Sequence, residues 1–161
     1  MSLLESYSFN KETLEIIGFT DLGKHTPEDQ KTKLGNHALV VMYQPFGSRW
    51  VQPIGAFLSR GAASSEVLYH IILESIVLLE NSNIRVNAVV SDAAQWNRGM
   101  WSLFGIDEEK VHTDHIADPE RKLWFCSDFP HLINNLRNWM VKPENREFEV
   151  GTRVANNIYR F

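Results

Sequence analysis

Hydrophobic and polar positions fall into blocks along this chain, and the first blocks predict strands. Three strand-like segments lie near residues 14–20, 37–43 and 50–58, separated by polar or glycine-containing turns. The stretch 45–48, Pro-Phe-Gly-Ser, has the composition of a hairpin turn. The chain is therefore expected to open with three consecutive strands.

A helical period follows these strands. Apolar residues recur at spacings of four, four and three, at Leu68, Ile72, Ile76 and Leu79. Ser64 or Ser65 can cap the start of this helix, and 81–83, Asn-Ser-Asn, can end it.

The next block is the most informative, because an apolar run ends in a carboxylate where a second helical pattern begins. Residues 88–90 are interpreted as a strand buried on both faces. Trp96, Met100, Leu103 and Phe104 then recur at helical spacing until Gly105. Asp92 is thus expected at a strand's carboxyl end, where open α/β sheets bind their ligands. Two roles stay open for Asp92 on this pattern, a cap for the following helix or a metal or catalytic ligand.

The last third of the chain predicts one more strand and one more helix. Residues 107–121 are charged and are interpreted as a loop, and 122–126 as a strand. A helix then runs from Asp128, its N-cap, to about residue 141. Its expected buried stripe is Leu132, Leu136 and Met140 with Ile133 beside it, and its polar face carries His131, Asn134, Asn135 and Asn138.

The predicted order is βββ-αβ-αβ-α, which is the order of the ribonuclease H-like α/β fold. With 161 residues and 43% hydrophobic content the chain suits a single globular domain. We expect this domain over 1–142, and a linker or the start of an inserted domain over 143–161. The single cysteine, Cys126, excludes an internal disulfide, and no apolar run approaches the roughly 20 residues that span a bilayer.

Charge and motifs exclude several function classes. The net charge of −4 argues against a dedicated basic DNA-binding module. His112, Asp114 and His115 are close in sequence but match no strong zinc spacing, so a polar loop is the favoured account. The five tryptophans could stack on bases, but we expect them mainly in the core. There is no phosphate-binding lysine loop, dinucleotide glycine motif or serine-hydrolase elbow.

Four segments together resemble one known family. They are Gly-Phe-Thr-Asp-Leu-Gly at 18–23, Trp-Val-Gln-Pro-Ile-Gly-Ala-Phe-Leu at 50–58, Val-Val-Ser-Asp at 89–92 with Asn97, and Asp128-Phe-Pro-His131-Leu-Ile with Leu136-Arg137-Asn138. In this order they resemble the ribonuclease H-like domain of P-element transposases and the THAP-domain transposase-like proteins derived from them. The resemblance covers about residues 9–141.

The resemblance implies a function for the longer proteins of this family. It implies a cut-and-paste DNA transposase of the nucleus, acting on transposon ends with an acidic triad that holds Mg²⁺ or Mn²⁺. A zinc-coordinating THAP domain, a GTP-binding insertion and homo-oligomers belong to those longer proteins. Carried over, Asp92 matches the second catalytic acid and is the expected metal ligand, while Asn97, Asp128, His131, Arg137 and Asn138 are further motif positions.

Two departures limit what is expected of this chain. The family's first acid lies in a strand before the first residue here, and its last acid lies after the inserted domain, so neither has a matched residue. Asp21 falls in a different family segment, and Asn134 replaces a usual lysine. We therefore expect a partial catalytic core that is inactive alone. The alternative is a domesticated, non-catalytic module that binds DNA or protein.

Overall fold

The computed structural model describes residues 8–10, 15–92 and 94–141. It contains ten elements in the order β1 (Ser8–Asn10), β2 (Glu15–Ile17), β3 (His37–Tyr43), β4 (Gln52–Ser59), α1 (Ser65–Asn81), β5 (Ala88–Ser91), α2 (Gln95–Leu103), β6 (His112–His115), β7 (Asp118–Ser127) and α3 (Phe129–Val141). The three helices alternate with the later strands, so the predicted mixed α/β class is confirmed.

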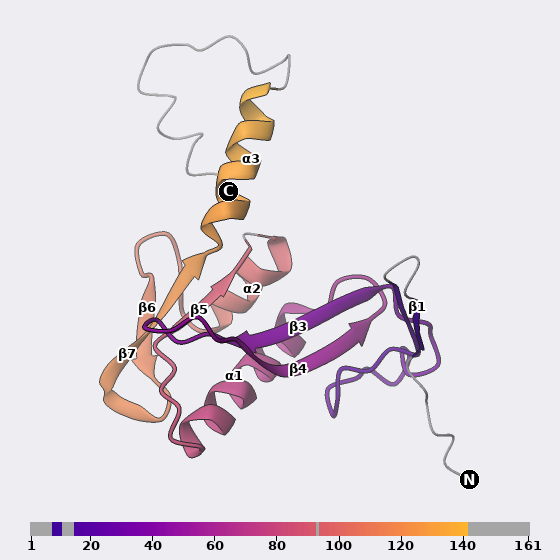
Figure 1. The fold of residues 1–161 in the computed structure, drawn as a ribbon, viewed down its shortest axis with the longest axis horizontal. Coiled ribbons are helices and arrows are strands. Elements are labelled where there is room, and N and C mark those ends of the chain that lie inside the picture. Colours follow the sequence, from indigo (N-terminus) through magenta and orange to yellow (C-terminus); the bar gives the residue numbers. More distant parts are fainter. Residues whose placement is uncertain (1–7, 11–14, 93, 142–161) are drawn as a thin grey trace.

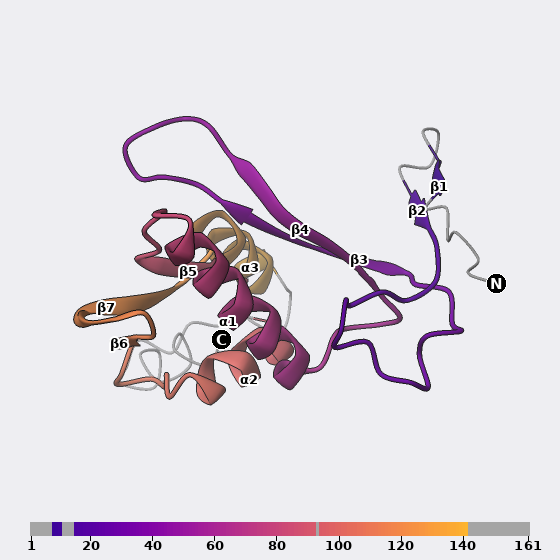
Figure 2. The ribbon, with the colours of Figure 1, turned by 90° about the horizontal axis from the view of Figure 1, so that it is seen from below.

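The described strands form three separate sheets. β1 pairs with β2, and β3 pairs with β4 in a long antiparallel hairpin whose connection includes the predicted turn at 45–48. The third sheet has the order β5-β7-β6, with β5 parallel to β7 and β6 antiparallel to it. Figure 2 shows the β3–β4 hairpin passing over α1, with the β5-β7-β6 sheet beside them.

One core joins α1, α2 and the mixed sheet. Its buried side chains are Leu68, Ile76, Leu79, Val86, Val89, Met100, Phe104, Ile106, Leu123 and Phe125. Leu39, Tyr43 and Ile54 of the β3–β4 hairpin pack against this cluster. The core thus fixes the carboxyl end of β5 between two helices and a neighbouring strand.

No helix within the described residues has the length and apolar character needed to cross a membrane.

Several helix and strand boundaries confirm the sequence pattern. The bounds of β3 match the prediction, and α1 begins after Ser64, whose hydroxyl accepts a hydrogen bond from the Val67 N–H. The second helix ends before Gly105, which has a φ of 74°. Such a positive φ favours glycine, which explains why the helical pattern stops there.

The charged stretch 107–121 is not simply a loop, and that prediction is wrong. It contains β6 and the first part of β7, which form an antiparallel hairpin. In this hairpin His115 and Leu123 are buried while Asp114 and Lys122 face outward and form an ion pair. The charges therefore mark the exposed face of a strand pair, which local polarity does not distinguish from a loop.

Two predictions of burial are also wrong, one for the strand at 88–90 and one for the tryptophans. Val90 is 61% exposed, because successive side chains of a strand point to opposite faces and Val89 is the one that points into the core. Trp50, Trp96 and Trp124 are 50%, 44% and 45% exposed, so these rings are not core side chains.

The predicted buried stripe on α3 is not buried. This helix has no buried residue, and Ile133 and Met140 are 46% and 47% exposed. The reason is its placement, because α3 projects away from the body (Figure 1). The expected linker or start of an inserted domain, 143–161, lies outside the described residues. The expected last residue of the domain, 142, also lies outside them.

Candidate functional site at the ends of two parallel strands

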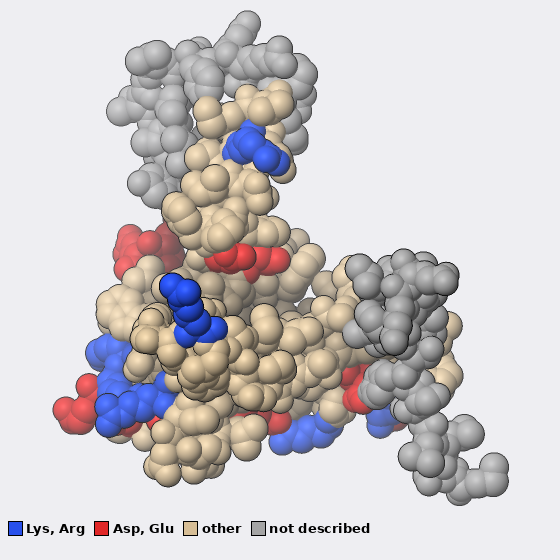
Figure 3. All heavy atoms as spheres, in the orientation of Figure 1, with Lys and Arg blue, Asp and Glu red and all other residues tan. Residues whose placement is uncertain are grey.

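The parallel strands β5 and β7 each end in a serine that is followed by an aspartate. The register between the strands brings the two aspartates to the same edge of the sheet. Ser91 of β5 is paired with Ser127 of β7, and Asp92 and Asp128 follow directly. The Asp128 N–H donates to the Ser91 carbonyl at 2.8 Å, which holds the two strand ends together. Figure 3 shows acidic atoms on the surface where α3 joins the body. This edge is the one that open α/β sheets use for ligands.

The carboxylate of Asp92 is held by two hydrogen bonds. Its Oδ1 accepts from the Ala94 N–H at 2.9 Å and from Asn97 Nδ2 at 2.6 Å. Asn97 is therefore a positioning residue for Asp92. The N-cap residue of α2 is Ala94, which makes no side-chain cap bond. Asp92 therefore accepts a backbone N–H ahead of the helix, as the capping alternative expected, but from outside the N-cap position. Asp92 instead closes the turn that leads into α2.

A hard divalent cation fits the donor chemistry of Asp92. The residue is half-buried on the end of a rigid strand, and both hydrogen bonds described above use Oδ1. Mg²⁺ and Mn²⁺ take oxygen ligands, and a carboxylate with its second oxygen directed elsewhere can supply one. Within residues 8–10, 15–92 and 94–141 no three His, Cys, Asp or Glu side chains converge as a metal site. Asp92 thus has the chemistry of one ligand for such an ion, and the described residues do not add a cluster of three.

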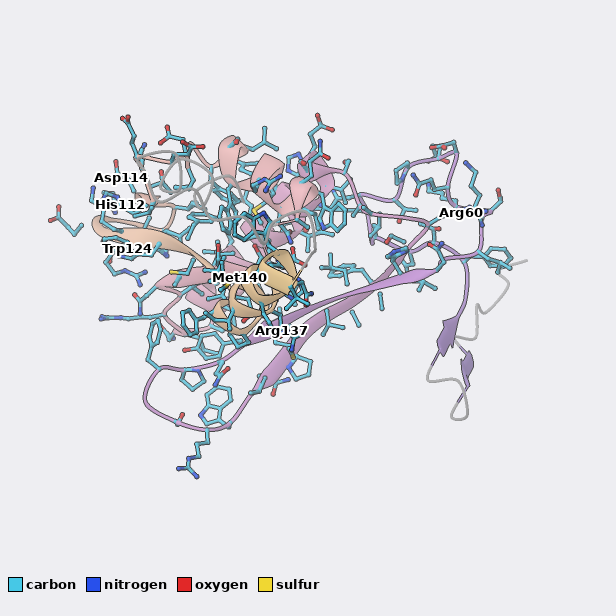
Figure 4. The ribbon with its side chains drawn as sticks, turned by 90° about the horizontal axis from the view of Figure 1, so that it is seen from above. Arg60, His112, Asp114, Trp124, Arg137 and Met140 are labelled. Carbon is cyan, nitrogen blue, oxygen red and sulfur yellow. The ribbon has the colours of Figure 1, made fainter. Side chains whose placement is uncertain are left out.

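Of the motif positions in and next to α3, Asp128 at the start of the helix lies at this edge of the sheet, and the others lie further along the helix. Asp128 lies at the N-cap position, since its carbonyl accepts from the Leu132 N–H at 2.9 Å. His131 is exposed one turn into the helix. Arg137 and Asn138 lie two turns along, where Arg137 Nη2 donates to Asn138 Oδ1 at 3.1 Å. Figure 4 shows Arg137 on α3, well apart from His112 and Asp114 at the β6 edge.

His112, Asp114 and His115 do not share a site. Asp114 is paired with Lys122, and His112 stacks edge-on against Trp124 with ring centroids 4.7 Å apart. His115 is buried and lies with Nε2 3.3 Å from Glu80 Oε1. These three residues therefore lie on β6 and contact different groups, which corrects the expectation of a polar loop at this place.

The sequence analysis did not predict a partly buried ion network around Glu80. Glu80, at the end of α1, accepts from Arg121 Nη2 at 2.6 Å and from the Val86 N–H at 2.7 Å. Arg121 also donates to Asp118 at 2.9 Å. Burial alone would raise the pKa of Glu80, but the Val86 N–H and Arg121 outweigh it, so this pKa lies below its ordinary value. Arg121 is held charged, with its pKa raised by Glu80. The network ties α1 to the β6–β7 hairpin.

The sequence analysis also did not predict that Asp92 and Asp128 follow neighbouring strands at the same edge of the sheet. The signal was present as two Ser-Asp dipeptides, each at the end of an apolar run. Recognising it required knowing that β5 and β7 are adjacent and parallel.

Comparison with known proteins agrees with this fold. Residues 1–105 match the family model described as TNP-like, RNase H N-terminal domain. The Transposable element P transposase of Drosophila melanogaster is 40% identical over 63 residues, which are 39% of this chain and 8% of that protein.

A solved structure shares the fold. The Drosophila P element transposase strand transfer complex contains a chain with a TM-score of 0.54 and 22% identity, over 88% of this chain and 27% of that one. The fold is therefore ribonuclease H-like, and the chain spans about a quarter or less of the length of these relatives. Since the family model covers well over half of its residues, the chain belongs to the TNP-like RNase H N-terminal domain family, the transposase-type domain of P-element relatives.

Proposed function

We propose that this chain is part of the catalytic core of a P-element-type DNA transposase, and that Asp92 is a ligand for Mg²⁺ or Mn²⁺. The observation that carries the proposal is the placement of Asp92, fixed by Asn97 and the Ala94 N–H at the carboxyl end of β5. Membership in the matched family supports the transposase part of the proposal, and Asp92 lies within the matched residues 1–105.

The chemistry explains why a fixed carboxylate is wanted there. In two-metal phosphoryl transfer, the ions lie about 3.5–4 Å apart and stabilise the attacking and leaving oxygens. A ligand on a rigid strand end holds such an ion without reorganising during the reaction. Within this chain Asp92 supplies one oxygen donor and Asn97 keeps its carboxylate in place. A complete site needs further acids, and the resemblance assigns them to parts of longer proteins that flank this segment.

The proposed partner of the longer protein is DNA, specifically transposon ends, and the proposed place of action is the nucleus. This rests on the transposase relatives, one of which was solved as a strand transfer complex. A GTP-binding insertion and a homo-oligomer remain proposals for the longer protein alone.

One observation favours a second candidate, a non-catalytic module that binds DNA or protein. In the described part of the chain, the acids do not form a three-residue metal cluster. A domain kept only for its surface would need no such cluster. The two candidates differ in whether Asp92 binds a metal ion at all.

Paramagnetic broadening by Mn²⁺ tests the metal assignment in the chain itself. We expect added Mn²⁺ to broaden the amide signals of residues 91–97 first, and Asp92→Asn to remove this broadening. The matched control is Asp29→Asn, which removes an exposed carboxylate paired with Lys33 and should leave the broadening unchanged. Broadening around β5 that persists in Asp92→Asn would refute the assignment.

A further inference from the structure

A hollow lies between the starts of α1 and α2. It has a volume of about 520 Å³, which is within the range of about 300–1,000 Å³ that is typical of ligand sites. The Ser65 hydroxyl donates to the Trp96 carbonyl at 3.0 Å, so a hydrogen bond between the two helices holds the walls together. Figure 2 shows α2 beside this end of α1. The walls are formed by Ser64 and Ser65 at the start of α1 and by Gln95, Trp96, Arg98, Gly99 and Ser102 of α2.

The first turn of α2 connects this hollow to the Asp92 site. Asn97 points to Asp92, with its Nδ2 2.6 Å from Asp92 Oδ1, whereas its two neighbours Trp96 and Arg98 line the hollow. Successive residues of an α-helix are about 100° apart around the axis, since one turn holds about 3.6 residues. One helical turn therefore carries the residue that holds the proposed metal ligand on one side and the wall of the hollow on another.

The chemistry of the hollow suits an anion that also carries an aromatic ring. None of the lining residues is an aspartate or a glutamate, and Trp96, which the sequence predicted in the core, is 44% exposed. Arg98 is exposed, and within residues 8–10, 15–92 and 94–141 its guanidinium makes no hydrogen bond or ion pair. An exposed indole stacks on an aromatic ring, and such a guanidinium forms charge-assisted hydrogen bonds with a phosphate. A nucleotide unit offers both groups.

The form of the nucleic acid follows from the geometry of stacking. Inside a duplex both faces of a base are covered by its neighbours, so a protein ring stacks on a base that is unpaired, flipped out or at a strand end. Cutting of DNA, which is the proposed reaction of the longer protein, creates such ends. The hollow shares a helical turn with the residue that holds Asp92, so it is placed to hold a base close to a cut.

We propose that the hollow holds one unpaired nucleotide of the DNA strand, next to the phosphate at the Asp92 site. The Trp96 indole stacks on the base, and the Arg98 guanidinium pairs with the phosphate of that nucleotide. Trp96 and Arg98 are therefore positioning residues, which place the strand without touching the reacting atoms. The choice of DNA rests on the proposed function, but binding in the hollow does not need a metal ion at Asp92.

Binding of a single strand to the purified chain tests the stacking. The probe is a fluorescein-labelled strand of about 12 thymidines, and its binding is measured by fluorescence anisotropy in EDTA. Trp96→Ala should weaken binding at least about fivefold, whereas Trp96→Phe, which keeps an aromatic ring, should retain most of it. The matched control Trp50→Ala removes an indole that is 50% exposed and lies outside the hollow, so it should leave binding unchanged. Equal effects of Trp96→Ala and Trp50→Ala, or a wild-type Kd above about 1 mM, would overturn the proposal.

A strand without bases separates stacking from charge. An abasic strand of the same length carries the same phosphates, so it should bind the wild type about fivefold more weakly and should not respond to Trp96→Ala. Arg98→Gln should lower the slope of log Kd against log salt by about 0.7, the value for one phosphate contact of a single strand. The control Arg49→Gln, at an exposed arginine between β3 and β4, should leave this slope unchanged.

Two results of these measurements would refute the nucleotide. Equal binding of the abasic and the thymidine strand by the wild type would show that charge alone is recognised. Displacement of the thymidine strand by a polyglutamate peptide of the same charge would assign the hollow to an acidic peptide.

This proposal and the proposed function fail in different experiments. The strand-binding measurements contain EDTA and do not depend on the metal assignment, which Mn²⁺ broadening tests. Absence of that broadening would remove the metal ion from Asp92, while binding that depends on Trp96 would still support the hollow. Loss of the contrast between Trp96→Ala and Trp50→Ala would refute the hollow alone.

Discussion

At the scale of single residues, Asp92 combines a structural and a proposed chemical role that substitution can separate. Its Oδ1 accepts from the Ala94 N–H and from Asn97. Asp92→Asn keeps an acceptor oxygen at this place, so without metal the free energy of unfolding should change by less than about 0.5 kcal/mol. Asp92→Ala removes the acceptor and should cost about 1 kcal/mol. Urea unfolding of the three proteins measures this, and an equal loss in both variants would contradict the hydrogen-bonding account.

Glu80 should make stability depend on acid pH. Its folded-state pKa lies below the ordinary 4.5, because the Val86 N–H and Arg121 outweigh the effect of burial. A depressed acid contributes stability that is fully present above its unfolded pKa and is lost as pH falls through the folded pKa. At pH 7, Glu80→Gln should therefore cost about 1.5–3 kcal/mol, by loss of a charged partner for Arg121.

The pH profile distinguishes this network from simple packing. The difference in unfolding free energy between wild type and Glu80→Gln should be constant near neutrality and shrink as pH falls below about 4.5. His115 and Asp118 also face the pair. The control is Glu66→Gln, which removes an exposed acid elsewhere on α1. A difference that is independent of pH would show that Glu80 acts only by its shape.

At the scale of elements, the contact of α1 with α2 depends on a glycine. A Cβ at Gly99 would lie 2.2 Å from Ser65 Oγ and 2.9 Å from Ser65 Cβ. Alanine is the better helix former by about 1 kcal/mol, but the clash should dominate and make Gly99→Ala destabilising by about 1–3 kcal/mol. Adding Ser65→Gly removes the clashing atoms.

Thermal or urea unfolding of the single and double variants measures this coupling. The double variant should lose less stability than the sum of the two single losses, even though Ser65→Gly also removes a hydrogen bond to the Trp96 carbonyl. Strict additivity would mean that the helices do not meet at this point.

The sequence predicted those elements whose apolar residues all pack on the same core cluster. The alternation in β3 and the spacing of Leu68, Ile76 and Leu79 in α1 follow directly from packing on the same cluster. The β6–β7 hairpin was missed because its burial depends on the neighbouring strand, which local charge does not reveal. The stripe on α3 was misjudged because amphipathic spacing indicates that a helix can be buried, and not whether the described chain provides a surface for it.

The candidate site was predictable in part for the same reason. Asp92 follows an apolar run and Asn97 comes five residues later, so the local sequence could place both residues at the end of the strand and the start of the next helix. The alignment of Asp128 with Asp92 depends on the register between β5 and β7. The Glu80–Arg121 pair joins positions 41 residues apart, and no local pattern encodes such a contact.

At the scale of the whole molecule, the charge and the single matched acid predict how the purified chain behaves with DNA. With a net charge of −4, binding to duplex DNA should be weak and should fall steeply with added salt. If Asp92 is the one catalytic acid that this chain supplies, as proposed, the chain should neither nick nor join DNA in Mg²⁺ or Mn²⁺. Gel assays on a supercoiled plasmid measure both activities, and metal-dependent cleavage that Asp92→Ala abolishes would show that this chain carries a complete site.

The most direct test of the central claim uses a longer polypeptide that contains this domain together with the other acids expected from the family. DNA strand joining is measured for the wild type, for Asp92→Asn and for the control Asp29→Asn, after unfolding experiments have shown that all three are equally folded. If Asp92 holds a catalytic metal ion, Asp92→Asn should lower joining by at least about a hundredfold, whereas Asp29→Asn should leave it unchanged. Undiminished joining by Asp92→Asn would contradict the account and leave Asp92 with the closing of the β5–α2 turn as its role.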